Sequence, residues 1–206
     1  MRITAALDDV LATRGHVRVL RALDALPEGF AVSARDMARR ADVAHNRTSE
    51  VLTKLTEIGL TRVQRAGRAD LYQLNRGHLM YGAVHDLFEQ EAAIQFALQK
   101  FLRRRLAKLG RVREAYIFGS VARGESRTGS DIDLALVIPP SGPTPAEQAQ
   151  IDEISTEVRR RFGSELAVHV SPRSVASRVD GRAGRDLWRR IQAEGIRLLP
   201  VEVRRG

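Results

Sequence analysis

Residues 118–138, FGSVARGESRTGSDIDLALVI, decide how the C-terminal half of this chain folds. A Gly-Ser pair, Gly119 and Ser120, precedes two aspartates, Asp131 and Asp133, which run directly into the apolar sequence LALVI. Side chains alternate along a strand, so both carboxylates lie on the same face. Two neighbouring carboxylates repel each other unless one is protonated or a cation lies between them. The pattern therefore predicts a cation site at the start of a buried strand.

The spacing also indicates which cation and which ligand belong there. A calcium loop would place another polar ligand two residues beyond Asp133, where this sequence has Ala135. Mg²⁺ or Mn²⁺ instead binds through one or two carboxylates together with substrate phosphates. Backbone N–H groups at Gly119 and the hydroxyl of Ser120 can bind such phosphates, while a Walker loop is absent. This combination is suited to nucleotidyl transfer.

The stretch GSVARGESRTGSDIDLALV resembles the Gly-Ser…Ser-Asp-x-Asp motif of the DNA polymerase β-like nucleotidyltransferase superfamily, particularly its minimal members. The resemblance extends over about 93–200 and implies an α/β fold with a small mixed sheet. It also implies a bound nucleoside triphosphate, with ATP as the expected nucleotide, and Mg²⁺ or Mn²⁺. The implied residues are Gly119, Ser120, Arg123 and Ser130 at the phosphates, and Asp131 and Asp133 at the metal and in catalysis. In the alternative, Ser120, Arg123 and the aspartates only pair with one another in a turn.

The sequence departs from the superfamily on the next strand, GSELAVHVSP at 163–172. Active members usually carry a third acidic residue there, which acts as base for the attacking hydroxyl. The best alignment places that acid at Ala167. Glu165 and His169 lie on the same face, one step away at about 7 Å, and are included as catalytic candidates. The departure puts transfer in doubt more than nucleotide or metal binding.

The N-terminal part predicts three helices and a hairpin. Helical spacing of apolar residues indicates helices at 16–26, 33–41 and 45–60. Two short alternating strands around Ala66-Gly67-Arg68 indicate a hairpin. The stretch from Ser33 to Asn75 resembles the winged helix-turn-helix superfamily, which implies an α+β winged helix that binds double-stranded DNA. The implied DNA contacts are Asn46, Arg47, Thr48, Ser49 and Lys54 at the recognition helix, and Arg62, Arg65 and Arg68 on the wing.

We expect three segments: a winged helix at 1–80, a helical connector at 81–109 and a nucleotidyltransferase-like domain at 110–206. The last domain should contain strands at 113–120, 131–138 and 165–172, a helix at 145–163, and a final helix and strand within 184–199. An apolar face of the connector, Ile94, Leu98, Phe101 and Leu102, suggests a homodimer contact.

Composition favours a soluble protein, with 43% hydrophobic and 29% charged residues and no cysteine. No apolar run is long enough to span a membrane, and the N-terminal segment carries acids where an export signal needs an apolar core. We therefore expect a cytoplasmic protein that does not bind membranes. The net charge of +9 favours polyanionic partners such as DNA.

Three functions remain open. The first is a DNA-binding protein with a Mg²⁺-dependent nucleotidyltransferase domain acting on an unknown acceptor. The second is a non-enzymatic transcriptional regulator whose degenerate domain senses nucleotide. The third is an antitoxin-like nucleotidyltransferase that acts on a partner toxin.

Overall fold

The computed structural model describes residues 6–127, 129–171, 189–191 and 193–199. The chain divides into two compact units, Met1–Ala93 and Ile94–Gly206. Helix α5, Tyr81–Leu106, crosses the division. Its Val84 packs in the hydrophobic core of the first unit, whereas Leu98, Phe101 and Leu102 pack in the core of the second. The segment expected as a separate connector is thus shared between two cores.

The first unit begins with four helices around one apolar core. Their bounds are α1 at Ala6–Val10, α2 at Arg14–Asp24, α3 at Ala34–Ala41 and α4 at His45–Glu57. Helix α3 begins after Ser33, whose hydroxyl accepts the backbone N–H of Asp36 and so caps the helix. From α4, Val51, Leu52 and Leu55 are fully buried, so the predicted apolar face of this helix is confirmed.

A small antiparallel sheet completes the first unit. Its strands are β1 at Val32–Ser33, β2 at Thr61–Ala66 and β3 at Ala69–Leu74, in the order β1-β3-β2. The predicted hairpin is confirmed: Gly67 has a φ of +62° in the turn, and Arg62 pairs with Gln73 across the two strands. Glycine is favoured in this left-handed conformation because it lacks a Cβ.

The second unit is built on a four-stranded mixed sheet in the order β6-β5-β4-β7. The strands are β4 at Glu114–Phe118, β5 at Ile132–Val137, β6 at Leu166–Ser171 and β7 at Ile196–Leu199. Strand β4 is antiparallel to both β5 and β7, whereas β6 is parallel to β5. The helices are α6 at Gly119–Ala122 and α7 at Pro145–Phe162, besides the C-terminal part of α5. The predicted small mixed sheet is therefore present.

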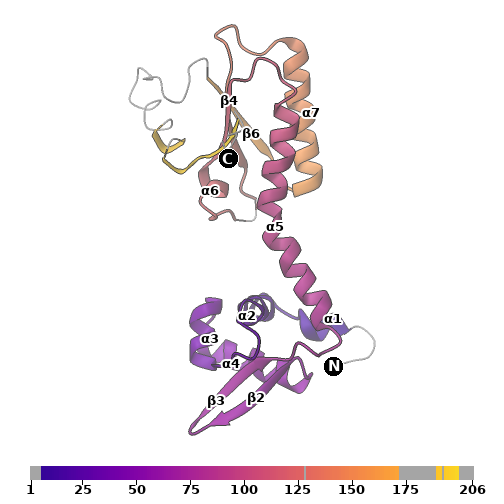
Figure 1. The fold of residues 1–206 in the computed structure, drawn as a ribbon, viewed down its shortest axis with the longest axis vertical. Helices are drawn as coiled ribbons and strands as arrows, with labels where there is room; N and C mark the ends of the chain where they lie inside the picture. Colours follow the sequence, from indigo (N-terminus) through magenta and orange to yellow (C-terminus); the bar gives the residue numbers. More distant parts are fainter. Residues whose placement is uncertain (1–5, 128, 172–188, 192, 200–206) are drawn as a thin grey trace, which may run out of the picture. The chain divides into compact units, whose positions relative to one another are not determined.

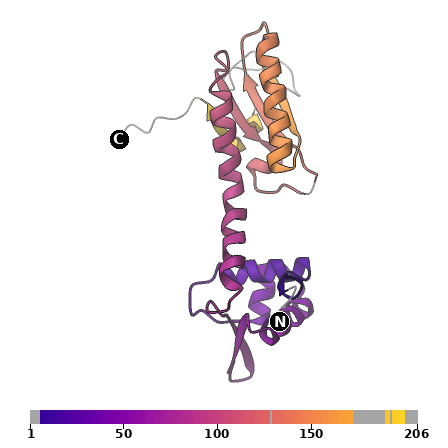
Figure 2. The same cartoon turned by 90° about the vertical axis from the view of Figure 1, so that its right-hand side faces the viewer.

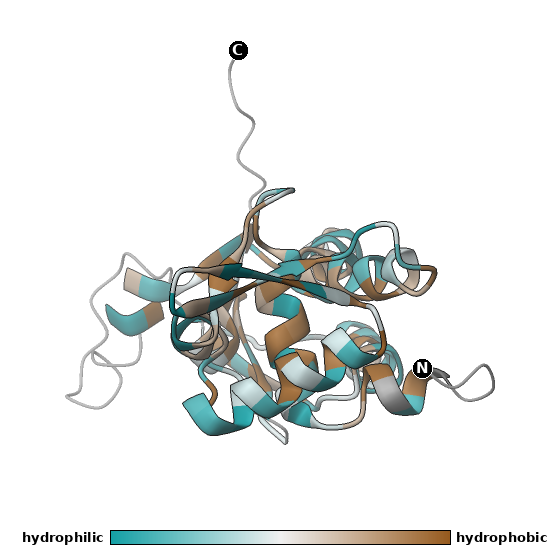
Figure 3. Cartoon of the chain, turned by 90° about the horizontal axis from the view of Figure 1, so that it is seen from below, coloured by the Kyte–Doolittle hydropathy of each residue, from teal (hydrophilic) through white to brown (hydrophobic). Residues whose placement is uncertain are grey.

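The two faces of this sheet have different environments. Ile132, Leu134 and Leu136 of β5 pack in a core with residues of α5 and α7, which lie side by side against the sheet (Figures 1 and 2). The alternate residues Asp133, Ala135 and Val137 point to the other face by strand alternation, and the last two pack with Phe118 and Ile191. Coloured by hydropathy, the helices in Figure 3 show hydrophobic and hydrophilic residues within the same helix. The sheet thus buries one face under helices and presents Asp133 on the other.

One sequence expectation changes at this level. Leu98, Phe101 and Leu102 are buried in the second core, and Ile94 is 53% exposed, so the apolar face proposed for dimerisation is already occupied. This correction follows because α5 is a packed element of the second unit and not a free connector. Part of the predicted helix in 184–199 lies outside the described residues; Arg189 to Ile191, Ala193 and Glu194 are helical.

No helix within the described ranges combines the length and apolarity that crossing a membrane requires.

Candidate functional site

The centre of the predicted site is a contact between Gly119 and Asp133. Phe118, the last residue of β4, pairs with Asp133 of β5, so Gly119 leaves the sheet beside that carboxylate. Gly119 has a φ of +71°, and a Cβ added there would lie 2.2 Å from Asp133 Oδ2 and 3.1 Å from its Cγ. The backbone of Gly119 therefore packs directly against the carboxylate, and no larger residue fits without movement. The Gly-Ser turn and the aspartate strand form one structural unit.

The residues after Gly119 form a single short helical turn rather than an open loop. In α6, the backbone N–H of Arg123 donates to the Gly119 carbonyl at 3.3 Å. The N–H of Glu125 donates to the Ser120 carbonyl at 2.8 Å. Ser120 thus occupies the first turn, next to the glycine that contacts Asp133.

Asp131 and Asp133 stand at the start of β5. Asp131 immediately precedes the strand and is exposed, while the side chain of Asp133 retains 30% of its exposure. In the part of the chain that the structure describes, no three His, Asp or Glu side chains gather as a metal site. Two solvent-accessible, oxygen-only ligands fit Mg²⁺ or Mn²⁺, which complete their coordination with phosphate oxygens and water.

Ser130 shapes the turn that leads into Asp131. Its hydroxyl accepts the backbone N–H of Arg127 at 2.9 Å, and its own N–H donates to the Arg127 carbonyl at the same distance. The contacts of Ser130 are therefore those of a turn that fixes where β5 begins, while its predicted contact with phosphates remains a prediction.

Arg123 does not neutralise the aspartates in this structure. Its Nε lies 2.8 Å from a Glu125 oxygen, and its Nη1 lies 2.9 Å from a Glu194 oxygen. Hydrogen bonds to Glu125 and then to Glu194 raise the pKa of the Arg123 guanidinium. The alternative in which Arg123 pairs with the aspartates is not the arrangement found. To contact phosphates as predicted, Arg123 would have to exchange its ion pairs with Glu125 and Glu194 for the new contact.

Strand β6 lies beside the aspartates, and its pairing fixes the position of the missing third acid. Ala167 is the partner of Asp133 in the parallel pair β5–β6. His169 Nε2 lies 3.8 Å from Asp133 Oδ1, beyond hydrogen-bond distance, and its ring meets Phe118 edge-on at 5.3 Å. The carboxylate of Glu165 instead lies 3.0 Å from Arg159 Nε. The structure brings His169 towards the aspartate and directs Glu165 to an arginine.

Tyr116 lies on the strand next to β5, and it was not among the site residues predicted from the sequence. It pairs with Ala135 in the β4–β5 ladder, and its hydroxyl donates to Glu114 at 2.8 Å. Burial, and then the bond to Glu114, raises the pKa of Tyr116 to about 12. The alternation of β4 could have placed this tyrosine on the aspartate face.

The predicted DNA contacts differ in exposure. Thr48 is fully buried, and its hydroxyl donates to the Ala44 carbonyl at 3.1 Å, so it is removed from the contact set as a correction. A threonine on the inner face of α4 cannot reach a base edge. Arg47 and Ser49 are half-buried, with Arg47 Nη1 2.7 Å from Glu50. The exposed members are Asn46, Lys54, Arg62, Arg65 and Arg68.

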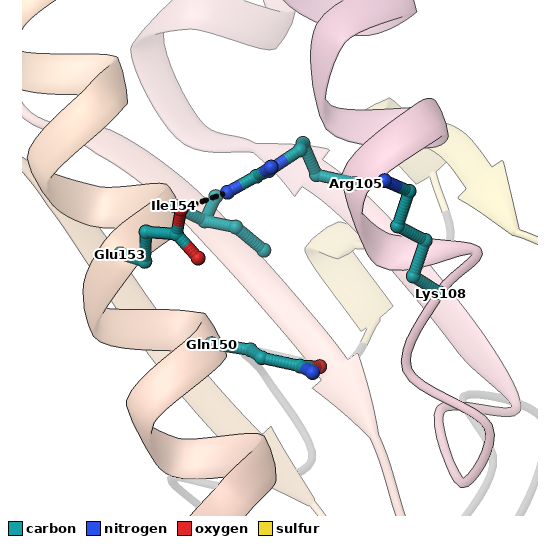
Figure 4. Close-up of a pocket in the computed structure, with 5 residues that line it drawn as sticks. All are labelled: Arg105, Lys108, Gln150, Glu153 and Ile154. Atoms are coloured by element: carbon teal, nitrogen blue, oxygen red, sulfur yellow. Dashed lines mark ion pairs between the residues drawn. The ribbon is translucent and has the colours of Figure 1, made fainter.

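A separate pocket lies between α5 and α7 in the second unit (Figure 4). It measures about 190 Å³ and is lined by Arg105, Lys108, Gln150, Glu153 and Ile154. Arg105 Nη2 is paired with Glu153 at 2.9 Å across it. Because none of its lining residues belongs to the predicted site, this pocket is distinct from the Gly119–Asp133 contact.

Comparison with known proteins supports a nucleotidyltransferase domain in the second unit. A family model described as "Nucleotidyltransferase domain" matches residues 98–184. This range includes the Gly-Ser turn, both aspartates and β6. Among curated proteins, no match was found.

Among solved structures, a similar chain comes from "Crystal structure of the toxin-antitoxin with AMP-PNP". It shares 18% identity, covers 51% of this chain and 72% of its own, and has a TM-score of 0.34. A likeness at this level carries no argument about function.

The Gly119 contact predicts a specific cost of adding a methyl group. Gly124 has the same φ of +71° but no atom within 4 Å of an added Cβ, so it is a matched control. Gly124→Ala should cost about 1–2 kcal/mol of unfolding free energy from backbone strain alone. Gly119→Ala should cost about 1–3 kcal/mol more, because the methyl group also overlaps the carboxylate.

Urea unfolding measures both costs. In an Asp133→Ala background the excess cost at Gly119 should vanish, because the overlapping atoms are gone. Equal costs at the two glycines would show that the contact with Asp133 is not tight.

Proposed function

We propose that the second unit binds a nucleoside triphosphate with Mg²⁺ or Mn²⁺ and transfers its nucleoside monophosphate to an acceptor hydroxyl. The acceptor oxygen would bond to the α-phosphorus, the bond to the β-phosphate would break, and pyrophosphate would leave. Asp131 and Asp133 would hold the metal, and Gly119 and Ser120 would hold the phosphates. The observation that carries the proposal is the packing of Gly119 against Asp133, which joins phosphate and metal ligands in one place. The match of residues 98–184 to a nucleotidyltransferase domain supports it.

Each residue has a defined task in this proposal. The backbone N–H groups of the Gly119–Ser120 turn and the Ser120 hydroxyl would donate to phosphate oxygens. Asp131 and Asp133 supply hard oxygen ligands; a divalent ion bound there would offset the charge that develops on the phosphoryl oxygens. His169 Nε2 would accept the proton of the attacking hydroxyl, since it is the imidazole nearest to Asp133 among the predicted residues. Glu165 is left out of this set because it pairs with Arg159.

A second function, a nucleotide sensor without transferase activity, is favoured by one observation. The partner of Asp133 on β6 is Ala167, at the position where the superfamily places its third acid. Alanine supplies neither a base nor a metal ligand. In this function, two carboxylates and the glycine turn bind nucleotide while transfer is absent.

For the first unit we propose a winged helix that binds double-stranded DNA. The order of α2, α3 and α4 followed by the β2–β3 hairpin supports this, as do the exposed cations Lys54 on α4 and Arg62, Arg65 and Arg68 on the hairpin. The antitoxin-like alternative remains a hypothesis, in which the acceptor of the nucleotide is a partner protein.

The metal-site proposal predicts a ligand-induced rise in thermal stability. A ligand at one hundred times its Kd stabilises the folded state by about 2.7 kcal/mol, so Mg²⁺ with ATP should raise the midpoint of the wild type by several degrees. Asp131→Asn/Asp133→Asn should lose this rise yet be no less stable without metal, because the repulsion between carboxylates is removed.

Differential scanning fluorimetry with ATP, CTP, GTP and UTP measures the rise and identifies the nucleotide. Asp152→Asn, an exposed carboxylate on α7, is the control and should respond as the wild type does. A full ligand response in the double aspartate variant would contradict the proposal.

Transferase and sensor differ in what happens to the α-phosphate. With α-labelled triphosphate, Mg²⁺ and cell lysate, we expect the wild type to label an acceptor slowly. Ala167→Asp should raise the rate about 100-fold or more, because a carboxylate beside Asp133 supplies the missing base. His169→Gln should slow the wild type while leaving the thermal response to ATP intact.

A sensor would give a different result: a thermal response to ATP with no labelled acceptor in the wild type. If Ala167→Asp then transferred label, the loss of activity would be assigned to that one position.

The DNA-binding proposal predicts how affinity depends on salt. Arg65→Ala/Arg68→Ala should weaken binding to all duplex sequences and reduce the slope of log K against log salt by about one to two. Arg104→Ala/Arg160→Ala removes the same charge from exposed positions of the second unit and is the matched control. Fluorescence anisotropy at several salt concentrations measures the slopes; equal slopes in both double variants would show that the hairpin does not contact DNA.

A further inference from the structure

The start of β7 brings a carboxylate, that of Glu194, to the Gly119 turn. Strand β7 is antiparallel to β4, with Ile196 opposite Ile117. Gly119 stands two residues after Ile117 and Glu194 two residues before Ile196, so both lie beyond the same end of this strand pair. The side chain of Arg123, four residues after Gly119, connects them, because its Nη1 lies 2.9 Å from a Glu194 oxygen.

Packing and a tight turn hold the backbone around Glu194. Ile191 is fully buried and packs with Phe118 and Val137, on the face of the sheet that also carries Asp133. The backbone N–H of Gly195 donates to the Ile191 carbonyl at 2.9 Å, and a Cβ added at Gly195 would lie 2.3 Å from that oxygen. Glu194, between these two anchored residues, is therefore kept at the edge of the aspartate face.

Glu194 has an unfavourable charge for a residue beside phosphates, because carboxylate and phosphate repel each other. It also engages Arg123, which the sequence predicted at the phosphates. The pair is open to solvent, since the side chains of Arg123 and Glu194 are 39% and 37% exposed. Exposed ion pairs contribute little to stability, so the two side chains can separate at small cost.

We propose that Glu194 is a positioning residue, which engages Arg123 in the free protein and releases it to a phosphate when a nucleoside triphosphate binds. The inference rests on the proposed nucleotide site at the Gly119–Ser120 turn. A phosphate can accept two parallel N–H bonds from one guanidinium, which favours the exchange once the triphosphate is in place. Because the ion pair must open first, Glu194 lowers the observed affinity for the triphosphate.

Isothermal titration calorimetry measures this effect with Mg²⁺ and whichever of ATP, CTP, GTP and UTP gives the largest thermal rise. Glu194→Gln should bind about threefold to tenfold more tightly than the wild type, because Arg123 is no longer engaged by this carboxylate. Arg123→Ala should bind about tenfold more weakly, since its bonds to phosphate are lost. Asp152→Asn removes the same charge from an exposed position on α7 and should bind as the wild type does.

A double-mutant cycle separates the exchange from simple repulsion between Glu194 and the phosphates. If Glu194 acts through Arg123, Glu194→Gln should improve binding less in an Arg123→Ala background than in the wild type. Repulsion alone would give an equal or larger gain there, because Arg123 no longer offsets the charge of Glu194. Without nucleotide, the thermal midpoint of each variant should stay within about 4 °C of the wild type, as expected for an exposed ion pair.

The possible outcomes distinguish this inference from the proposed function. Binding that depends on Asp131 and Asp133 but is unchanged by Glu194→Gln would overturn the inference and leave the nucleotide site in place. An equal or larger gain in the Arg123→Ala background would overturn it as well. If neither the wild type nor Glu194→Gln bound a triphosphate, the proposed function would fail and the inference with it. Binding by Glu194→Gln and not by the wild type would support both.

Discussion

The backbone of Gly119 lies against the carboxylate of Asp133, and the arrangement of the second unit's site depends on that contact. The antiparallel pairing of β4 with β5 brings Phe118 opposite Asp133, so the chain must turn away at the carboxylate itself. Only glycine combines a φ of +71° with the room that Asp133 requires. The position of the Ser120 turn is therefore set by the register of the sheet, and Asp131 immediately precedes the strand that carries Asp133.

The same constraint leaves the two aspartates in need of a positive partner. Arg123, the arginine of the motif that was considered as their partner, is engaged with Glu125 and Glu194. His169 Nε2 lies 3.8 Å from Asp133 Oδ1, and the strand partner of Asp133 on β6 is Ala167, which carries no carboxylate. A divalent ion accompanied by phosphates is the partner that we propose. In the proposed function, nucleotide binding would need the turn and the aspartates, whereas transfer would also need a base, so the two could be lost separately.

The sequence predicted local features well and long-range ones poorly. Alternation identified β5 and the spacing of apolar residues identified α3, and the strand partner of Asp133 on β6 is Ala167, the position at which the alignment expected a third acid. Periodicity identified the apolar face of α5 but not what packs against it. Leu98 and Phe101 pack against a sheet formed by residues far along the chain. Thr48 was predicted as a DNA contact from its place in the recognition helix. Its burial depends on which face of α4 packs against the core, and the residue type does not show that. The partners of Arg123 depend in the same way on Glu194, which only tertiary structure brings near.

The most direct test of the central claim is to locate the metal. Crystals grown with Mn²⁺ and a non-hydrolysable triphosphate analogue, measured at the manganese absorption edge, would show the ion by its anomalous scattering. The account predicts a peak within about 2.0–2.3 Å of carboxylate oxygens from both Asp131 and Asp133, with the phosphates at the Gly119–Ser120 turn. A peak elsewhere, or bound nucleotide with no metal at the two aspartates, would contradict it.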